Sequence, residues 1–174
     1  KSFYKHIKDG LMYMGEPSDY KVFHLHFKEI RENADVGIEN CNWSNYFTEE
    51  FCIPNEVYRY AIDMTEKEVY QAVEGLYHNL NTLQSRSGNQ LPFTSINYGT
   101  CTEPEGRMVT KALLDVSIGG IGKLHKTSIF PCGIFQCMKG VNRKPGEPNY
   151  DLYQLALKST AQRLYPNYAN VDWS

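Results

Sequence analysis

Residues 91–137, LPFTSINYGTCTEPEGRMVTKALLDVSIGGIGKLHKTSIFPCGIFQC, carry the patterns of a strand, a helix and a second strand. The first strand, Leu91–Gly99, contains Phe, Thr, Ile and Tyr. Thr102-Glu103-Pro104-Glu105 then starts a helix, because it combines a capping residue, early carboxylates and a proline in the first turn. Ser128–Cys137 is apolar at both alternating sets of positions, which predicts a strand covered on both faces; Pro131 weakens this strand or marks a bulge.

The alternation continues towards the end of the chain. Asn149–Leu164 predicts a second helix, with leucines recurring on one face and Pro166 just beyond its end. Asn170–Trp173 is expected to open a further strand. The order strand, helix, strand, helix, strand predicts an α/β fold with a parallel sheet.

A third helix precedes this segment. Thr65-Glu66-Lys67-Glu68 matches a capping box and predicts a helix over Glu66–Leu83. Val69, Val73 and Leu76 begin its apolar face. Gln84–Gln90 follows as a polar, glycine-bearing loop.

The N-terminal part is less regular. A helix over Ser2–Tyr13 and a strand over Val22–Lys28 are the elements expected there. The chain therefore divides into a mixed helical and strand region, residues 1–64, and a βαβαβ segment, residues 65–174. We expect the whole to be a fragment of one larger domain.

Composition narrows the class of protein. The 174 residues are 41% hydrophobic and 22% charged, with a formal net charge of −2, close to an average globular domain. This charge predicts neither a nucleic-acid nor a membrane partner, and no apolar run reaches the roughly 20 residues of a membrane helix. Five cysteines without a C-x-x-C pair favour reduced thiols in a cytoplasmic protein, with no metal site.

Several short motifs are similar to parts of known functional sites. Ser117–Lys123, SIGGIGK, is similar to the end of a phosphate-binding loop, but it follows a helix and lacks the Ser or Thr after the lysine, which favours a helix C-cap. His24 and His26 would share a strand face without a third metal ligand. His78 and His125 have no recognisable catalytic partner.

Two other stretches leave alternatives open. Cys101 follows a predicted strand end, where it is either a reactive thiol or, more often, a packed one. The loop before Leu91 joins hydrogen-bonding side chains, a cation and a glycine, and such a loop can close on a polyanion or be an ordinary surface loop. Its residues are Ser85, Arg86, Ser87, Gly88, Asn89 and Gln90.

Five ordered motifs extend the interpretation. They are SRSGNQLPFTSINYGT (85–100), PEGRMVTKALLDVSIGGIG (104–122), IFPCGIFQ (129–136), GVNRKPGEPNYDLYQLA (140–156) and AQRLYPN (161–167). Together they resemble the middle of the catalytic subunit of anaerobic (class III) ribonucleoside-triphosphate reductases. The resemblance covers Met64–Ser174 and extends to residues 1–14.

This resemblance implies a glycyl-radical enzyme whose α/β barrel consists of two parallel half-sheets, of which this chain would form a part. The parent enzyme would reduce ribonucleoside triphosphates to deoxyribonucleotides with formate, under ATP and dNTP effectors. It would carry structural zinc, form a homodimer and need a radical-SAM activating protein. The radical glycine, the thiyl cysteine and the zinc cysteines are expected outside these residues, so the segment alone would be inactive, with no catalytic residue, cofactor or metal of its own.

The resemblance also implies roles within the segment. Gln84–Gln90 would be the loop that connects the effector site with the substrate base, and Leu91–Gly99 a barrel strand. Because alternate strand residues share a face, Ser95 and Asn97 are expected to point into the substrate cavity. The candidate substrate and effector residues are therefore Ser85, Arg86, Ser87, Gly88, Asn89, Gln90, Ser95 and Asn97.

Two other functions stay open at this point. One is a different glycyl-radical enzyme with the same barrel, which the GNQLPFTSINYG motif disfavours. The other is a free-standing nucleotide-binding or interaction module without catalytic activity. A part of a barrel would also leave sheet edges and an apolar face uncovered, which predicts oligomerisation or covering by the first 64 residues.

Overall fold

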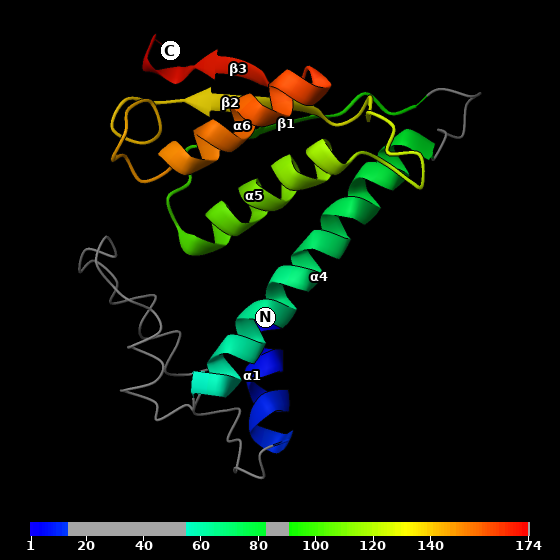
Figure 1. The fold of residues 1–174 in the computed structure, drawn as a ribbon, viewed down its shortest axis with the longest axis vertical. Coiled ribbons are helices and arrows are strands. Elements are labelled where there is room, and N and C mark those ends of the chain that lie inside the picture. The colour runs from blue at the N-terminus through cyan, green and yellow to red at the C-terminus, as the bar shows by residue number, and fades with distance from the viewer. Residues whose placement is uncertain (14–54, 83–90, 174) are drawn as a thin grey trace. The chain divides into compact units, whose positions relative to one another are not determined.

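The computed structural model describes residues 1–13, 55–82 and 91–173 (Figure 1). The chain divides into two compact units, Lys1–Glu68 and Val69–Ser174, and helix α4 (Asn55–Thr82) runs through the boundary. The strand expected over residues 22–28, the histidines in it, and Cys41 and Cys52 lie outside the described residues.

In the described residues of the first unit, helix α1 (Ser2–Tyr13) packs against the N-terminal part of α4. Helix α1 forms as the sequence predicts. Ile7, Val57 and Ala61 are buried in this unit. Gly10 allows the close packing of α1 on α4, because a Cβ atom there would lie 2.9 Å from Cγ1 of Val57.

Helix α4 begins at Asn55 and not at Glu66, so the predicted capping box is wrong. Thr65 lies inside the helix, and its hydroxyl donates to the carbonyl of Ala61 at 2.6 Å. The helix extends upstream because Val57 and Ala61, four residues apart, share a buried face. The predicted apolar face also shifts, since Leu76 is exposed.

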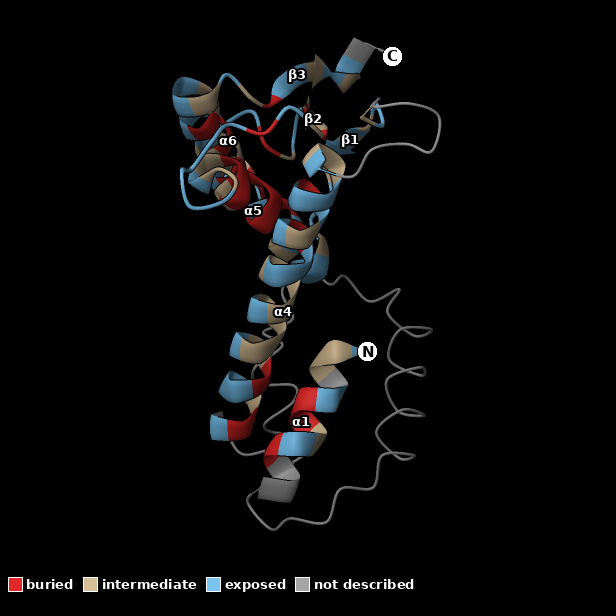
Figure 2. Cartoon of the chain, turned by 90° about the vertical axis from the view of Figure 1, so that its right-hand side faces the viewer, coloured by how far each residue is buried: buried red, intermediate tan, exposed pale blue. Residues whose placement is uncertain are grey.

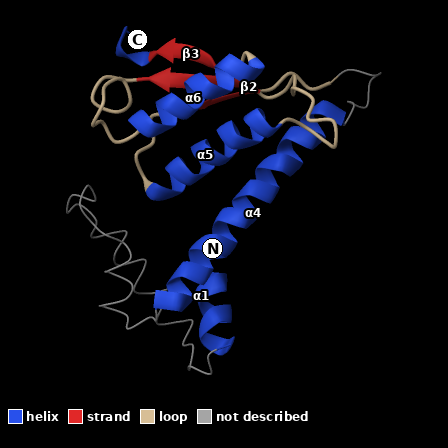
Figure 3. Ribbon diagram, in the orientation of Figure 1, coloured by secondary structure: helices blue, strands red, loops and turns tan. Residues whose placement is uncertain are grey.

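The second unit is an α/β segment with a parallel sheet, as predicted. Strands β1 (Ser95–Tyr98), β2 (Cys132–Cys137) and β3 (Asn167–Asn170) lie in that order and pair in parallel. Helices α5 (Pro104–Gly119) and α6 (Tyr150–Arg163) connect them and lie on the same face of the sheet (Figures 1 and 3). The three described strands form an open sheet, and the barrel stays a prediction.

The strands differ from the predicted ranges. β2 begins only after Pro131, and the third strand ends where a strand was expected to open, because Val171–Trp173 forms a 3-10 turn. The carboxylate of Asp172 in this turn accepts the Lys139 amide at 2.9 Å. Within the described residues β2 is not covered on both faces: Gly133 and Phe135 are buried, while the alternate positions are half-buried.

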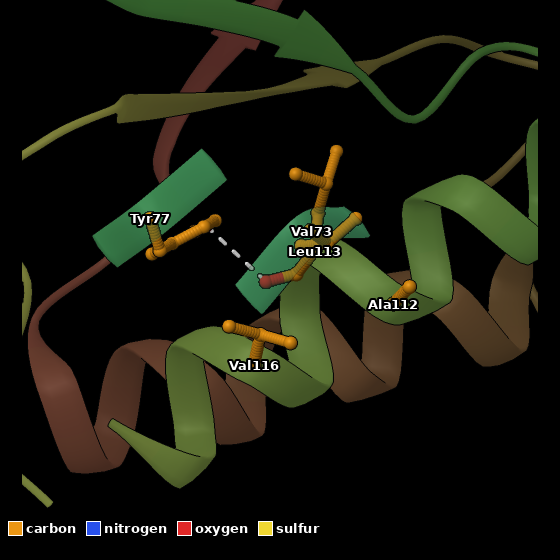
Figure 4. Close-up of a cluster of buried hydrophobic side chains, with 5 residues drawn as sticks. All are labelled: Val73, Tyr77, Ala112, Leu113 and Val116. Atoms are coloured by element: carbon orange, nitrogen blue, oxygen red, sulfur yellow. Dashed lines mark hydrogen bonds between the residues drawn. The ribbon is translucent and has the colours of Figure 1, made fainter. Parts of the chain in front are cut away.

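In the described part of the second unit, two clusters of buried residues lie on opposite sides of α5, and Figure 2 shows many buried residues on this helix. Val73 and Tyr77 of α4 pack against Ala112, Leu113 and Val116 of α5 (Figure 4). The second cluster contains Leu114, Phe135, Leu152 and Ala156. Tyr98 packs against both clusters, so β1 is fixed by both layers of contacts.

The ends of α5 match their sequence signals. Pro104 occupies the first turn, although the N-cap residue Glu103 makes no side-chain cap hydrogen bond. At the other end Gly120 has a φ of +75°, and its amide donates to Val116 at 3.0 Å. The glycine-rich stretch is therefore a helix C-cap, as expected. In the described part of the chain, no helix is both long and apolar enough to cross a membrane.

Candidate functional site

The face of the sheet opposite the helices carries the two described candidate residues. Along β1, Ile96 and Tyr98 are half-buried and pack against the core, whereas Ser95 and Asn97 are exposed. Side chains alternate along a strand, so Ser95 and Asn97 share the face that α5 and α6 leave uncovered.

The pairing register extends this open face across the sheet. Ser95 lies beside Cys132 and Asn97 beside Ile134, which in turn pairs with Asn167. Residues paired across parallel strands point to the same side. The open face therefore carries uncharged side chains; it comprises Ser95, Asn97, Cys132, Ile134, Gln136, Asn167 and Ala169. The hydroxyl of Ser95 and the amides of Asn97, Gln136 and Asn167 can exchange hydrogen bonds with hydroxyl or phosphate groups.

A pocket of about 410 Å³ lies at the carboxyl end of β1, beside the first turns of α5. Asn97 and Gln136 reach it from the sheet, and Cys101 and Glu105 line it from the strand end and the helix. The hydroxyl of Thr100 lies 3.4 Å from Oε1 of Gln136. The carboxyl ends of parallel strands are where α/β proteins most often bind ligands.

Asn142 holds the ends of β1 and β2 together. It is fully buried, and its amide nitrogen donates to the carbonyls of Gly99 at 3.0 Å and Gln136 at 2.8 Å. Its oxygen accepts the Met138 amide at 2.9 Å. The side chain thus satisfies backbone groups that the sheet leaves unpaired where the strands end.

Asn149 repeats this arrangement from the start of α6. It is also fully buried and donates to the carbonyls of Gly99 at 3.0 Å and Cys101 at 2.8 Å. The guanidinium of Arg107 donates to its oxygen at 2.6 Å and to Asp151 at 2.6 Å. The strand end next to the pocket is therefore fixed by buried amides and an ion pair.

A carboxylate organises the turn between these asparagines. Glu147 accepts the backbone amides of Lys144 at 2.9 Å, Gly140 at 3.0 Å and Arg143 at 2.5 Å. These donors, that of Lys144 first, hold the pKa of Glu147 below its ordinary value. The pKa of Asp172 is likewise lowered, by the Lys139 amide first and then by Arg143.

The asparagines and Glu147 were not among the predicted site residues. Their segment, GVNRKPGEPNYDL (140–152), belongs to the resemblance but carries no local pattern that indicates a buried network. Of the eight predicted residues, the structure describes Ser95 and Asn97 and places them on one face. Residues 85–90 lie outside the described residues, and their ligand role stays a prediction.

The described cysteines are free thiols. Cys101 is exposed at the edge of the pocket, against the first turn of α5. Cys132 and Cys137 are half-buried, and burial raises the pKa of Cys137. Among the described residues, no three His, Cys, Asp or Glu side chains gather as metal ligands.

His78 and His125, for which the sequence offered no partner, line a second pocket of about 550 Å³. It lies between α4 and the end of α5. Nδ1 of His125 is 2.9 Å from the carbonyl of Gly119, which fixes this ring against the helix end.

A family sequence model and several known proteins that match this chain all carry the same description. Residues 13–174 match the sequence model of the family described as anaerobic ribonucleoside-triphosphate reductase. The protein of that name from Haemophilus influenzae is 40% identical over 124 residues, which are 71% of this chain and 17% of the relative. The Salmonella typhimurium protein is 39% identical over 134 residues, which are 77% of this chain and 18% of the relative. The Enterobacteria phage T4 protein is 43% identical over 108 residues, which are 62% of this chain and 18% of the relative. The chain thus spans less than a fifth of the length of these curated relatives.

Proposed function

The chain belongs to the anaerobic ribonucleoside-triphosphate reductase family, and from this premise we propose that it works as a segment of a longer enzyme. That enzyme reduces ribonucleoside triphosphates to deoxyribonucleoside triphosphates and so supplies precursors for DNA replication in the cytoplasm. The proposal is supported by the family match together with the polar open face of the sheet.

The segment would supply strands of the catalytic barrel. In α/β barrels the helices form the outer layer, and strand residues on the other face line the interior. Helices α5 and α6 occupy one face here, so Ser95 and Asn97 are on the side that a barrel would enclose. Their hydroxyl and amide groups would hydrogen-bond the ribose or phosphates of the substrate.

The radical chemistry belongs to the rest of the proposed enzyme. A glycyl radical generated by a radical-SAM activating protein, formate as reductant, structural zinc and a homodimeric effector site are parts of the proposal outside this segment. In this proposal the zinc ligands are supplied by parts of the enzyme outside the segment. Residues 84–90 would connect bound effector with substrate choice.

Kinetics of the full-length enzyme test the role of the open face. Ser95→Ala and Asn97→Ala should each lower kcat/KM about 10-fold, because each removes a hydrogen bond to bound substrate, worth about 1.4 kcal/mol. Asn79→Ala, at an exposed position of α4, is the control and should leave kcat/KM unchanged. Full activity of both open-face variants would reject this role.

The effector role of the loop has a separate test. Arg86→Ala or Asn89→Ala should change which ribonucleotide is reduced under a given effector in an anaerobic assay. Wild-type preference in both variants would reject the loop assignment. The alternative, a nucleotide-binding module without catalysis, predicts instead that dNTPs bind the 174-residue chain in calorimetry while an enzyme lacking the segment retains its turnover.

A further inference from the structure

Asn81, in the last turn of α4, forms four hydrogen bonds with the backbone. Its side-chain nitrogen donates to the carbonyls of Tyr77 at 2.7 Å and Phe130 at 2.5 Å. Its side-chain oxygen accepts the amides of Ile129 at 2.8 Å and Phe130 at 3.1 Å. Both hydrogens and both lone-pair directions of the amide are therefore used.

This bonding pattern is specific to an asparagine. The side chain meets both the amide and the carbonyl of Phe130, much as a neighbouring strand would. A hydrophobic side chain offers none of these bonds, and aspartate can accept but not donate when ionised. Phe130 lies two residues before β2, so Asn81 joins the end of α4 to the entry of that strand; Figure 1 shows this end of α4 beside the connection into β2.

Phe130 also contacts the chain that leads into β1. The ring of Phe93 packs edge-on against the ring of Phe130, with centroids 5.5 Å apart, although Phe93 is 80% exposed. One step further on, the Cys132 amide donates to the carbonyl of Thr94 at 2.8 Å. Phe130 is thus a common anchor: Asn81 attaches to its backbone and Phe93 to its ring.

These contacts bracket a part of the chain with a proposed role. Asn81 precedes residues 84–90 and Phe93 follows them, and Ser95 begins the strand two residues after Phe93. A displacement of the α4 end relative to Phe130 would therefore be passed to β1, and with it to Ser95.

We propose that Asn81 is a positioning residue for substrate specificity: through Phe130 it fixes the end of α4 against the entries of β1 and β2. This rests on the proposed reductase function. The residue does not touch the substrate; it holds the entries of the strands that carry the open face against the end of α4, the helix that precedes the proposed effector loop in the sequence. Loss of its bonds should therefore weaken the link between effector and substrate choice more than it weakens turnover.

The test uses the full-length enzyme. For each variant, kcat/KM is measured for a purine and a pyrimidine ribonucleotide, with and without a dNTP effector. Asn81→Leu should reduce the effector-induced change in the kcat/KM ratio about 10-fold, and Asn81→Asp should give an intermediate loss because it keeps the acceptor oxygens. Asn79→Ala, two residues away and exposed, should keep the full effector response.

Phe93→Leu provides a second readout if Asn81→Leu does not fold. Phe93 is exposed, so the fold tolerates its loss, and the variant should reduce the effector response in the same direction. An unchanged effector response in Asn81→Asp and Phe93→Leu, with only lower thermal stability, would show a merely structural joint and overturn the proposal.

The loop variants separate this inference from the proposed function. If Arg86→Ala and Asn89→Ala change the substrate preference but the Asn81 and Phe93 variants do not, the reductase assignment stands and the inference fails. If the Asn81 and Phe93 variants change it but the loop variants do not, the positioning role of Asn81 stands, and Arg86 and Asn89 are not the residues through which the effector acts. If no variant changes the substrate preference, the inference and the loop assignment both fail, and only the turnover of ribonucleotides in the same assay still tests the reductase assignment.

Discussion

Asn142 and Asn149, both fully buried, each donate a hydrogen bond of 3.0 Å to the same carbonyl oxygen, that of Gly99. Gly99 has a φ of +116°, a conformation that favours glycine, and it directly follows β1. The end of this strand is therefore fixed by residues more than 40 positions away in the sequence. This arrangement places the residues of the adjoining pocket before any ligand arrives.

Replacing Asn149 by leucine should destabilise the chain by about 2–4 kcal/mol. The variant keeps the volume but leaves the carbonyls of Gly99 and Cys101 with fewer donors and Arg107 without its buried acceptor, and each unpaired buried group costs roughly 1–3 kcal/mol. The free energy of unfolding is obtained from urea titration. Asn79→Leu is the matched control, with a change of about 0.5 kcal/mol or less. A similar, small change in both variants would contradict the role of the network.

Two glycine-to-alanine changes should alter stability in opposite directions. At Gly106 a Cβ atom would lie 2.3 Å from Sγ and 2.8 Å from Cβ of Cys101, so Gly106→Ala should cost about 1–3 kcal/mol. A Cβ atom at Gly75 in α4 would have no neighbour within 4 Å beyond the adjoining helix backbone, so Gly75→Ala should stabilise by about 0.5–1 kcal/mol. Thermal and urea unfolding measure both. Adding Cys101→Gly to Gly106→Ala should recover most of the loss, and no recovery would show that another contact is responsible.

The ends of α5, the order of strands and helices and the side-chain alternation along β1 could be predicted from the sequence, because each depends on residues close together in the chain. Pro104 and Gly120 bound α5 as expected, because a proline in the first turn and a glycine with positive φ at the end act through the backbone of their own segment. The strand and helix alternation gave the parallel sheet. Ser95 and Asn97 fall on one face because strand alternation is a local property.

Tertiary contacts decided the rest. Thr65 had the signature of a helix start, but Val57 and Ala61 pack in the first unit and extend α4 past it. The buried roles of Asn142 and Asn149 depend on bonds to Gly99, for which no local pattern exists. Asparagine usually indicates a turn or a surface position, so its type alone gave no sign of a buried network.

Acid should weaken the turn around Glu147. Its pKa is lowered in the folded state, so its stabilising effect is complete above the ordinary value of 4.5 and is lost as the pH falls through the folded pKa. Glu147→Gln cannot ionise and keeps only one acceptor oxygen. The difference in unfolding free energy between wild type and Glu147→Gln should therefore be largest near neutral pH and shrink below pH 4.5. A difference that stays constant down to pH 3 would show that the carboxylate charge contributes nothing to this turn.

Alkaline pH should act on the core through Tyr77. Its hydroxyl donates to the carbonyl of Leu113 at 3.2 Å, and burial raises its pKa from 10.0 to about 12 (Figure 4). The folded state thus favours the neutral phenol, whose stabilising effect is complete below pH 10 and is lost as the pH rises through 12; a two-unit shift corresponds to roughly 2–3 kcal/mol.

Tyr77→Phe should cost about 1 kcal/mol at pH 7 through the lost hydrogen bond. Above pH 10 the variant should lose less stability than wild type, so that the two unfolding free energies approach and then cross. Tyr60→Phe, at an exposed position, is the control and should follow the wild-type curve. Parallel curves for wild type and Tyr77→Phe between pH 9 and 12 would contradict the burial of an ionisable phenol against α5.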